Sequence, residues 1–197
     1  MKVSTELDTR FRTAALAGGL VDVAYELADT PLGKLLLART ERGLCRIEYD
    51  PEPDRGVETL ARTFGRRVLR TPGALDEARR QLDEYFEGNR RFFELELDLG
   101  LATKPFSRQV LEQLAHVPYG EVTTYGALAA QAGAPRAARA VGTVMNRNPI
   151  PIVLPCHRVV GASGSLVGYG GGLPRKEALL RLESALDPKP YVSLCLP

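Results

Sequence analysis

Cysteine and histidine are scarce in this chain of 197 residues, which contains three cysteines and two histidines. The cysteines, Cys45, Cys156 and Cys195, are too few for a disulfide framework, and their odd number leaves at least one thiol free. Free thiols are typical of a reducing compartment. A structural zinc site usually needs four Cys or His ligands, and no Cys-x-x-Cys pair accompanies His116 or His157. The sequence therefore predicts no metal site.

Long apolar runs are missing as well. No stretch reaches the length of a membrane-spanning helix, and the segment 14–20 is too short and too broken by glycine for a secretory signal. We therefore expect a cytoplasmic protein without a membrane partner. Hydrophobic residues make up 44% and charged residues 25% of the chain, which is an ordinary balance that permits a buried core.

The net charge is only +2, but it is unevenly distributed. Residues 1–100 carry 16 basic and 19 acidic side chains, a balance of −3, whereas residues 101–197 carry 10 basic and 5 acidic ones, a balance of +5. A polyanion would therefore bind the second half of the chain. A modest excess of this kind also occurs on solvated surfaces, so charge alone leaves both interpretations open.

The patterning divides the chain into an N-terminal domain, residues 1–100, and a C-terminal domain, residues 101–197. In the first, residues 1–20 show no clear periodicity and predict a loose arm. Alternating apolar residues predict a small antiparallel sheet, and a helix follows with Leu82 and Tyr85 on its apolar face. The expected strands are the segments 21–27, 35–37, 45–49 and, after the helix, 93–99.

The C-terminal domain is predicted to be mainly helical. One helix begins at Pro105, and a second follows Thr124 as its N-cap and runs through Ala132. Pro135 fits the first position of a third helix that ends near Met145. Two short helices joined by a glycine turn are the skeleton of a helix-turn-helix. A last helix is expected over about 174–186.

The string Pro155-Cys156-His157-Arg158 joins a candidate nucleophile to a candidate base. A thiolate is a far better nucleophile than a thiol, and a nearby imidazole can take the thiol proton. Adjacent side chains of an extended segment point in opposite directions, so a turn or a bridging water must bring the sulfur and the imidazole together. Glu183 on the last helix is a candidate to orient the imidazole, as the carboxylate of a triad does. A buried structural cysteine is the alternative.

The predicted third helix is rich in methyl groups, which is unusual for a helix that reads the major groove. Small side chains would let its backbone approach DNA closely in the minor groove, with Arg139 as the one long side chain able to enter the base stack. A plain Ala-rich core helix is the alternative. The small residues are Ala137, Ala138, Ala140 and Gly142.

A glycine run, 168–172, contains Tyr169. Glycines let the backbone approach a ligand, and the tyrosine could stack on a flat one. The run lacks the spacing and strand context of a phosphate loop, so we reject a nucleoside triphosphate site. A flexible loop is the alternative.

Together these residues resemble the O6-alkylguanine-DNA alkyltransferases, also called methylated-DNA–protein-cysteine methyltransferases. The resemblance runs from about Pro105 to Glu183, and the N-terminal half resembles the family's more variable domain through 31–33 and 82–88. The strings that carry it are Pro118-Tyr119-Gly120-Glu121-Val122-Thr123-Thr124-Tyr125, Arg139-Ala140-Val141-Gly142, Asn148-Pro149, Pro155-Cys156-His157-Arg158-Val159-Val160, Gly168-Tyr169, Lys176-Glu177 and Leu179-Leu180.

The resemblance implies an α/β (α+β) fold, with a ribonuclease H-like N-terminal domain and a winged helix-turn-helix-like C-terminal domain. It implies DNA repair by irreversible transfer of the alkyl group from O6-alkylguanine, and from O4-alkylthymine, in flipped-out DNA to a cysteine. Each molecule would act once and need no cofactor. The partner would be double-stranded DNA, bound through its minor groove by a monomer, with cooperative assembly left open.

The resemblance also implies residue roles in catalysis. Cys156 would accept the alkyl group, while His157, through a water, and Glu183 would form the relay that deprotonates it. Asn148 would hold the turn between the recognition helix and the active-site segment.

Other residues would bind substrate and DNA. Arg139 would fill the gap left by the flipped nucleotide, and Tyr125 would contact the guanine. Tyr169 would wall the pocket, with backbone contacts to the base from Cys156, Val159 and Gly170. Tyr125 and Lys176 are the candidate proton donors to the leaving guanine. The helix backbone at Ala137, Ala138, Ala140 and Gly142 would lie against the groove.

Three other functions remain as alternatives. A sensor would bind alkylguanine without repairing it, but non-catalytic relatives lack the cysteine of this motif. A winged-helix transcription regulator would read a DNA sequence, which the methyl-rich helix disfavours. A cysteine hydrolase would turn over an ester or amide repeatedly. The tail, 188–197, with Cys195 as a candidate second thiol, matches nothing that we can interpret.

Overall fold

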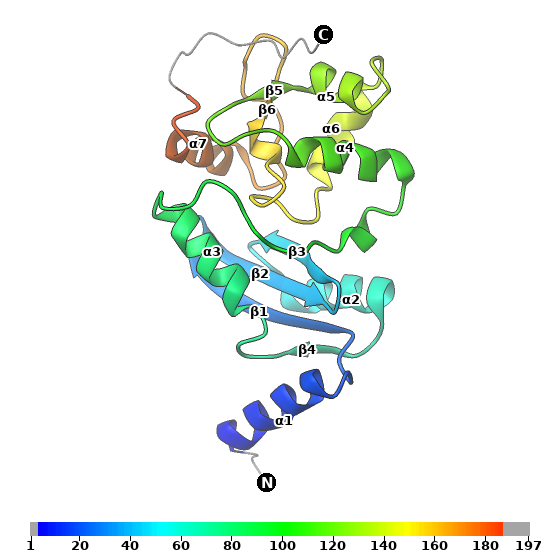
Figure 1. The fold of residues 1–197 in the computed structure, drawn as a ribbon, viewed down its shortest axis with the longest axis vertical. Helices are drawn as coiled ribbons and strands as arrows, with labels where there is room; N and C mark the ends of the chain where they lie inside the picture. The colour runs from blue at the N-terminus through cyan, green and yellow to red at the C-terminus, as the bar shows by residue number, and fades with distance from the viewer. Residues whose placement is uncertain (1–3, 187–197) are drawn as a thin grey trace. The chain divides into compact units, whose positions relative to one another are not determined.

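The computed structural model describes residues 4–186, so the tail that carries Cys195 lies outside the described residues. The chain divides into two compact units, 1–103 and 104–197, each of which is described by itself (Figure 1). Within 4–186, no helix is both long and apolar enough to cross a membrane.

The N-terminal unit is built on a four-stranded sheet with the order β3-β2-β1-β4. The first three strands pair antiparallel, as predicted, and Glu26 lies opposite Leu37. The fourth strand pairs parallel with the first and was missed, because three residues are too short to show an alternation. The strands are β1 Val23–Thr30, β2 Gly33–Thr40, β3 Gly43–Tyr49 and β4 Val68–Arg70.

Helices cover both faces of this sheet, α2 (Pro53–Phe64) on one and α3 (Asp76–Phe86) on the other (Figure 1). Alternate residues of a strand point to opposite faces, so each strand contributes to two packing layers. On the α2 side, Leu60 packs in one buried cluster with Val23, Leu36, Ala38 and Cys45. On the α3 side, Arg79 lies 3.6 Å from the buried Glu26.

The prediction of a loose arm over residues 1–20 is wrong, because a helix, α1 (Thr5–Ala17), occupies most of that segment. The Ser4 hydroxyl accepts a hydrogen bond from the Leu7 amide at 3.3 Å and so caps its first turn. An ion pair one turn apart, Arg12 to Asp8 at 2.7 Å, adds support. The helix buries little apolar surface, so the sequence shows no clear apolar stripe.

The strand expected at 93–99 is also wrong. Only an isolated bridge, Leu44 to Leu97, forms there, and a short 3-10 helix, η1 (Leu99–Leu101), follows it. Two hydrogen bonds, Leu44 N to Glu96 O and Asp98 N to Leu44 O, both 2.8 Å, make up this pairing. The alternating apolar residues thus belong to a segment that packs against the edge strand β3 without forming a regular strand.

The C-terminal unit is mainly helical, with one two-stranded parallel pair, β5 with β6. Thr124 caps α5 as predicted, since its hydroxyl accepts from the Ala127 amide at 3.1 Å. Gly133, with φ +73°, lies in the turn between α5 and α6. The elements are α4 Pro105–Ala115, β5 Thr123–Thr124, α5 Tyr125–Gln131, α6 Ala138–Asn146, η2 Cys156–Arg158, β6 Val159–Val160 and α7 Leu173–Leu182.

Two predicted helix boundaries in this unit are wrong. Pro135 does not open α6, because residues 134–137 form a turn closed by Ala137 N to Ala134 O at 2.8 Å, and the helix begins at Ala138. The last helix ends at Leu182 rather than near 186, since Ser184 has φ +56° and cannot continue an α-helix.

Candidate active site

Cys156 opens the 3-10 turn η2 directly after a tight loop, and its side chain is buried. The amide of Asn148 spans that loop. Its Nδ2 donates to the Leu154 carbonyl at 2.8 Å and to Cys156 Sγ at 3.1 Å, while its Oδ1 accepts from the Ile150 amide at 3.1 Å. One side chain therefore fixes the loop and points an N–H group at the sulfur.

The loop itself is conformationally strained. Ile152 has φ +76°, a region that β-branched residues rarely adopt and that costs about 1–3 kcal/mol. The Ile150 carbonyl accepts from the Leu154 amide at 2.9 Å, which closes the turn around it. Such strain persists only where surrounding contacts impose it, and the Asn148 bridge is one of them.

His157 is fully buried and pairs with a carboxylate rather than with the thiol. Its Nε2 lies 2.9 Å from Glu183 Oε1, whereas its Nδ1 has no hydrogen-bond partner within residues 4–186. Burial lowers the pKa of His157 by more than its hydrogen bond to Glu183 raises it, so the imidazole is neutral at pH 7. An ionised Glu183 accepts a hydrogen bond from Nε2–H. The neutral imidazole therefore carries its free lone pair on Nδ1.

Sequence reasoning assigned no role to Arg158, which proves to be the main partner of Glu183. Its Nε and Nη2 atoms donate to the two oxygens of Glu183, each at 2.8 Å, and its Nη1 donates to the Val117 carbonyl at 2.6 Å. The Gly120 amide adds a contact of 3.3 Å to Glu183. The only signal in the sequence was a charged residue within the otherwise apolar run after His157.

Glu183 is therefore a buried anion held by cations and N–H groups. Burial alone would raise the pKa of Glu183, but hydrogen bonds from His157 and Arg158 outweigh it and lower the pKa to about 2. Tyr119 closes this cluster, with its ring 5.8 Å from the Arg158 guanidinium and its hydroxyl donating to the Leu182 carbonyl at 3.0 Å.

The thiol of Cys156 is protonated in the resting protein. Burial raises its pKa to about 11, although the Asn148 hydrogen bond and the charge of Lys176 both act to lower it. A reaction of this sulfur therefore needs a base, and the same two groups are available to stabilise the thiolate once it forms.

Lys176 and Tyr125 bind the same short segment, Val167 to Gly168. The Lys176 ammonium donates to the carbonyls of Val159 at 2.6 Å, Val167 at 2.8 Å and Gly168 at 3.4 Å. The Tyr125 hydroxyl donates to those of Val167 and Gly168 at 3.1 and 3.4 Å. Burial lowers the pKa of Lys176 to about 8 and raises that of Tyr125.

Tyr169 and Gly170 follow this clamped segment, the tyrosine half-buried and the glycine exposed. A Cβ atom at Gly170 would lie 3.4 Å from the Asn146 carbonyl, which ties the glycine run to the end of α6. The Lys176 ammonium is fully buried and engaged by carbonyls, so it positions this segment and acts on Cys156 through its charge.

The helix α6 has one buried face and one outward face. Val141, Val144 and Met145 are buried, whereas Arg139 and Ala140 are exposed. The helix is therefore not wholly buried, because Arg139 and the small residue Ala140 are open to solvent. Ala137, Ala138 and Gly142 are half-buried, and a Cβ at Gly142 would lie 3.9 Å from the ring of Tyr125.

The structure thus gathers one set of predicted residues around the sulfur and leaves another on an adjoining surface. Around Cys156 lie Asn148, Lys176 and Tyr125, and next to it in the chain is the His157–Glu183 pair. Among residues 4–186, no three histidine, cysteine or carboxylate side chains lie close enough to hold a metal ion.

Comparison with known proteins identifies both units. Residues 23–99 match the family model of the 6-O-methylguanine DNA methyltransferase ribonuclease-like domain, and residues 105–185 match that of the DNA binding domain of the same enzymes. The fold predicted from the sequence agrees with these two matches.

The matches to individual relatives span nearly the whole length of each relative. The chain is 44% identical over 169 residues to a methylated-DNA–protein-cysteine methyltransferase of Mycobacterium bovis, covering 84% of this chain and 95% of the relative. It is also 44% identical to the Salmonella typhimurium protein of that name, covering 82% and 95%. A crystal structure of the Mycobacterium tuberculosis protein in complex with DNA superposes with a TM-score of 0.72 at 42% identity, covering 82% and 93%.

Proposed function

The chain belongs to the 6-O-methylguanine DNA methyltransferase family, and from that premise we propose that it repairs DNA by moving an alkyl group from O6-alkylguanine to Cys156. The observation that carries this proposal is the buried thiol of Cys156, held by the Asn148 amide and facing the charge of Lys176. It is a methylated-DNA–protein-cysteine methyltransferase in activity, and DNA is its partner.

The thiol proton leaves first. His157 is neutral, and its Nδ1 atom has no hydrogen-bond partner within the described residues. It is therefore the base that accepts this proton through a bridging water. The resulting imidazolium would gain from the ionised Glu183 at 2.9 Å. Arg158 keeps Glu183 ionised, so the carboxylate orients the imidazole and stabilises its charge without taking the proton.

The transfer itself is a displacement at carbon. The thiolate forms a sulfur–carbon bond to the alkyl group while the bond between that carbon and guanine O6 breaks. The leaving guanine retains the electron pair and takes up a proton, and Tyr125 is the candidate donor. A thioether resists hydrolysis and thiol exchange under mild conditions, so we expect one transfer per molecule. The same displacement would apply to O4-alkylthymine.

The target base must come to the sulfur, because Cys156 is only 3% exposed and a base inside a duplex cannot reach it. We propose that the nucleotide rotates out, which costs a few kcal/mol. The exposed Arg139 would enter the gap that it leaves. The pair α5 and α6 would act as a helix-turn-helix with α6 in the minor groove, where exposed methyl groups permit close approach.

A stoichiometric assay tests this proposal. An excess of duplex oligonucleotide containing O6-methylguanine is mixed with the protein, and restored guanine is counted after the reaction stops. We expect one guanine per protein molecule, with Cys156→Ala binding the duplex but restoring none. Repeated turnover would indicate a hydrolase or demethylase, and tight binding without restoration by the unmodified protein would indicate a sensor.

A further inference from the structure

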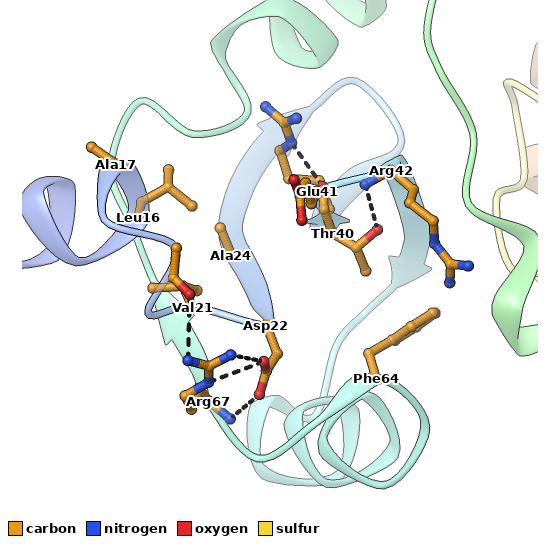
Figure 2. Close-up of a pocket in the computed structure, with 12 residues that line it drawn as sticks. Leu16, Ala17, Val21, Asp22, Ala24, Thr40, Glu41, Arg42, Phe64 and Arg67 are labelled. Carbon is orange, nitrogen blue, oxygen red and sulfur yellow. Dashed lines mark hydrogen bonds and ion pairs between the residues drawn. The ribbon is translucent and has the colours of Figure 1, made fainter.

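A second pocket lies in the N-terminal unit and plays no part in the alkyl transfer. Figure 2 shows it between the end of α1, the start of β1, the β2–β3 hairpin and the end of α2. Its volume is about 560 Å³, which is within the usual range of small-molecule sites. It is lined by Leu16, Ala17, Gly19, Val21, Asp22, Ala24, Arg39, Thr40, Glu41, Arg42, Phe64 and Arg67.

One wall of this pocket comes from the segment that precedes the family match. The match to the ribonuclease-like domain begins at residue 23, so it assigns no role to the lining residues 16–22. Hydrogen bonds fix that wall in place. Arg12 Nη1 donates to the Arg70 carbonyl at 2.9 Å, and Arg67 Nη1 donates to the Gly19 carbonyl at 3.3 Å. The pocket is therefore built by the docking of α1 and its following turn.

The three arginines that line the pocket are not equivalent. Arg42 donates to both oxygens of Asp98 at 3.1 Å, and Arg67 is bound to Asp22, with its Nε at 3.0 Å. Arg39 is half-buried, and its only hydrogen bond within the described residues runs from Nε to the Thr40 carbonyl at 3.3 Å. Its two terminal nitrogens thus remain available, in the fork geometry that suits an oxyanion.

The rest of the lining restricts the ligand further. Asp22 and Glu41 also line the pocket, and although Asp22 is paired with Arg67, the Glu41 carboxylate would repel a ligand of high negative charge. Side chains without charge supply apolar wall, and among them Phe64 offers an aromatic ring (Figure 2). These conditions favour one negative charge attached to a flat or apolar body.

We propose that this pocket binds a nucleotide-sized organic monoanion, with its oxyanion on the Arg39 guanidinium and its flat or apolar body against Leu16, Val21 and Phe64. A phosphodiester with an attached base has this chemistry. Such a group occurs both in free cyclic nucleotides and in a nucleic-acid strand, and the two sources share the same recognition.

The test is a titration of the full chain followed by methyl NMR, which reports on Leu16, Val21 and Ala24 directly. The probes are 3′,5′-cyclic AMP and the dinucleotide dTpdT, both monoanionic phosphodiesters. Adenosine lacks the anion, and inorganic phosphate lacks the flat body. We expect saturable shifts of the pocket methyl groups with at least one phosphodiester, and weaker or no shifts with adenosine and phosphate. Binding of cyclic AMP would identify free nucleotides as a source, and binding of dTpdT alone would identify a strand.

Three variants distinguish binding in this pocket from nonspecific attraction of an anion to surface arginines. Arg39→Gln should weaken binding about tenfold, the value of one charge-assisted hydrogen bond. Leu16→Asp, which puts a carboxylate into the apolar wall, should weaken it as well. The matched control is Arg66→Gln, since Arg66 is exposed beside Arg67 but does not line the pocket. Methyl transfer from O6-methylguanine DNA should be unchanged in all three.

Three results would overturn the proposal. They are the absence of saturable pocket shifts with either phosphodiester, adenosine binding as tightly as cyclic AMP, and equal affinities of Arg39→Gln and Arg66→Gln. An unchanged methyl spectrum outside the pocket shows that each variant is folded, so a loss of binding is then a property of the site.

Discussion

The two described cysteines, one in each unit, are both buried, yet their sulfurs have different hydrogen-bond partners. Burial and the nearby Asp98 charge together raise the pKa of Cys45 to about 12, although the Arg46 charge acts to lower it. Cys45 Sγ donates to the Ala38 carbonyl at 3.3 Å, which favours the thiol. Burial raises the pKa of Cys156 to about 11, against the Asn148 N–H group and the Lys176 charge. Burial keeps both thiols protonated, but Cys156 accepts a side-chain N–H bond from Asn148, whereas the Cys45 thiol donates to a carbonyl.

Two ion pairs, one from each unit, also lie in different surroundings. In the N-terminal unit, pairs such as Arg80 with Glu77 lie on the surface, with side chains 53% and 58% exposed. In the C-terminal unit, the side chains of Arg158 and Glu183 are 8% and 0% exposed. Exposed pairs contribute little to stability, whereas a broken buried pair leaves an uncompensated charge. Breaking the Arg158–Glu183 pair should therefore cost more than breaking the Arg80–Glu77 pair.

The largest expected difference between the two cysteines is whether methyl transfer survives when each one is replaced. Cys156→Ala should abolish methyl transfer from duplex DNA, whereas Cys45→Ala should retain one transfer per molecule, because Asn148 and the Lys176 charge favour a thiolate at Cys156 and the Asp98 charge opposes one at Cys45. Restored guanine is the measurement for both variants. Transfer that survives in Cys156→Ala would remove the distinction between the two sites.

The next effect separates the buried ion pair from the exposed one. Glu183→Gln should lower the free energy of unfolding by about 3–5 kcal/mol, because it leaves Arg158 buried without its counter-charge. Glu77→Gln should lower it much less, because water screens an exposed pair. Urea denaturation of the two variants and the parent chain measures both values. Equal losses would mean that the Arg158–Glu183 pair is no more important than a surface pair.

Acid should weaken the C-terminal unit through the same carboxylate. The pKa of Glu183 is lowered from 4.5 to about 2 in the folded chain, so its contribution is fully present above about pH 5 and is lost as the pH falls toward 2. The shift corresponds to about 3 kcal/mol. Urea denaturation at a series of pH values should show a shallower acid slope in Glu183→Gln than in the parent chain. Identical slopes would contradict the assignment.

A smaller effect distinguishes duplex DNA from a free base. Arg139→Ala should slow repair of a duplex by about tenfold to a hundredfold, because the flipped state loses the side chain that fills its gap. The reaction with free O6-benzylguanine should be nearly unchanged, since no base has to be rotated out. Single-turnover rates on both substrates test this, and equal slowing on both would remove the gap-filling role.

The smallest expected effect concerns the thiol alone. Asn148→Ala should slow alkylation of Cys156 by iodoacetamide at pH 8 by about tenfold, because loss of the N–H contact raises the thiol pKa further. Asn146→Ala is the control, since Asn146 is exposed and its side chain does not contact the sulfur. Faster alkylation in Asn148→Ala would instead show that the amide shields the sulfur.

Local patterns predicted local structure well. The alternation at 21–27, 35–37 and 45–49 predicted three strands that the sheet contains, and Thr124 caps its helix as expected. The parallel β4 was missed because its pairing with β1 joins residues that are 45 apart, with no periodic signal in three residues. The helix α1 was missed because its apolar side chains stay largely exposed, with Leu7 at 58% and Phe11 at 66%.

The candidate site shows the same limit. The string around Cys156 indicated the candidate nucleophile and the histidine, and the structure brings the Asn148 amide to the Cys156 sulfur. The hydrogen bonds from Arg158 to Glu183 join residues 25 apart in the sequence. The hydrogen bond from Lys176 to Val159 joins residues 17 apart. Those contacts depend on how α7 packs against η2 and the β6 strand that follows it, which no short pattern specifies.

The most direct test of the central claim is the position of the adduct. The protein is mixed with an oligonucleotide containing O6-methylguanine, its intact mass is measured before and after, and the product is digested for peptide mapping. We predict a single added methyl group, saturating at one per molecule, on the peptide that contains Cys156. A methyl group on Cys45 or Cys195, or restored guanine with no change in mass, would contradict transfer to Cys156.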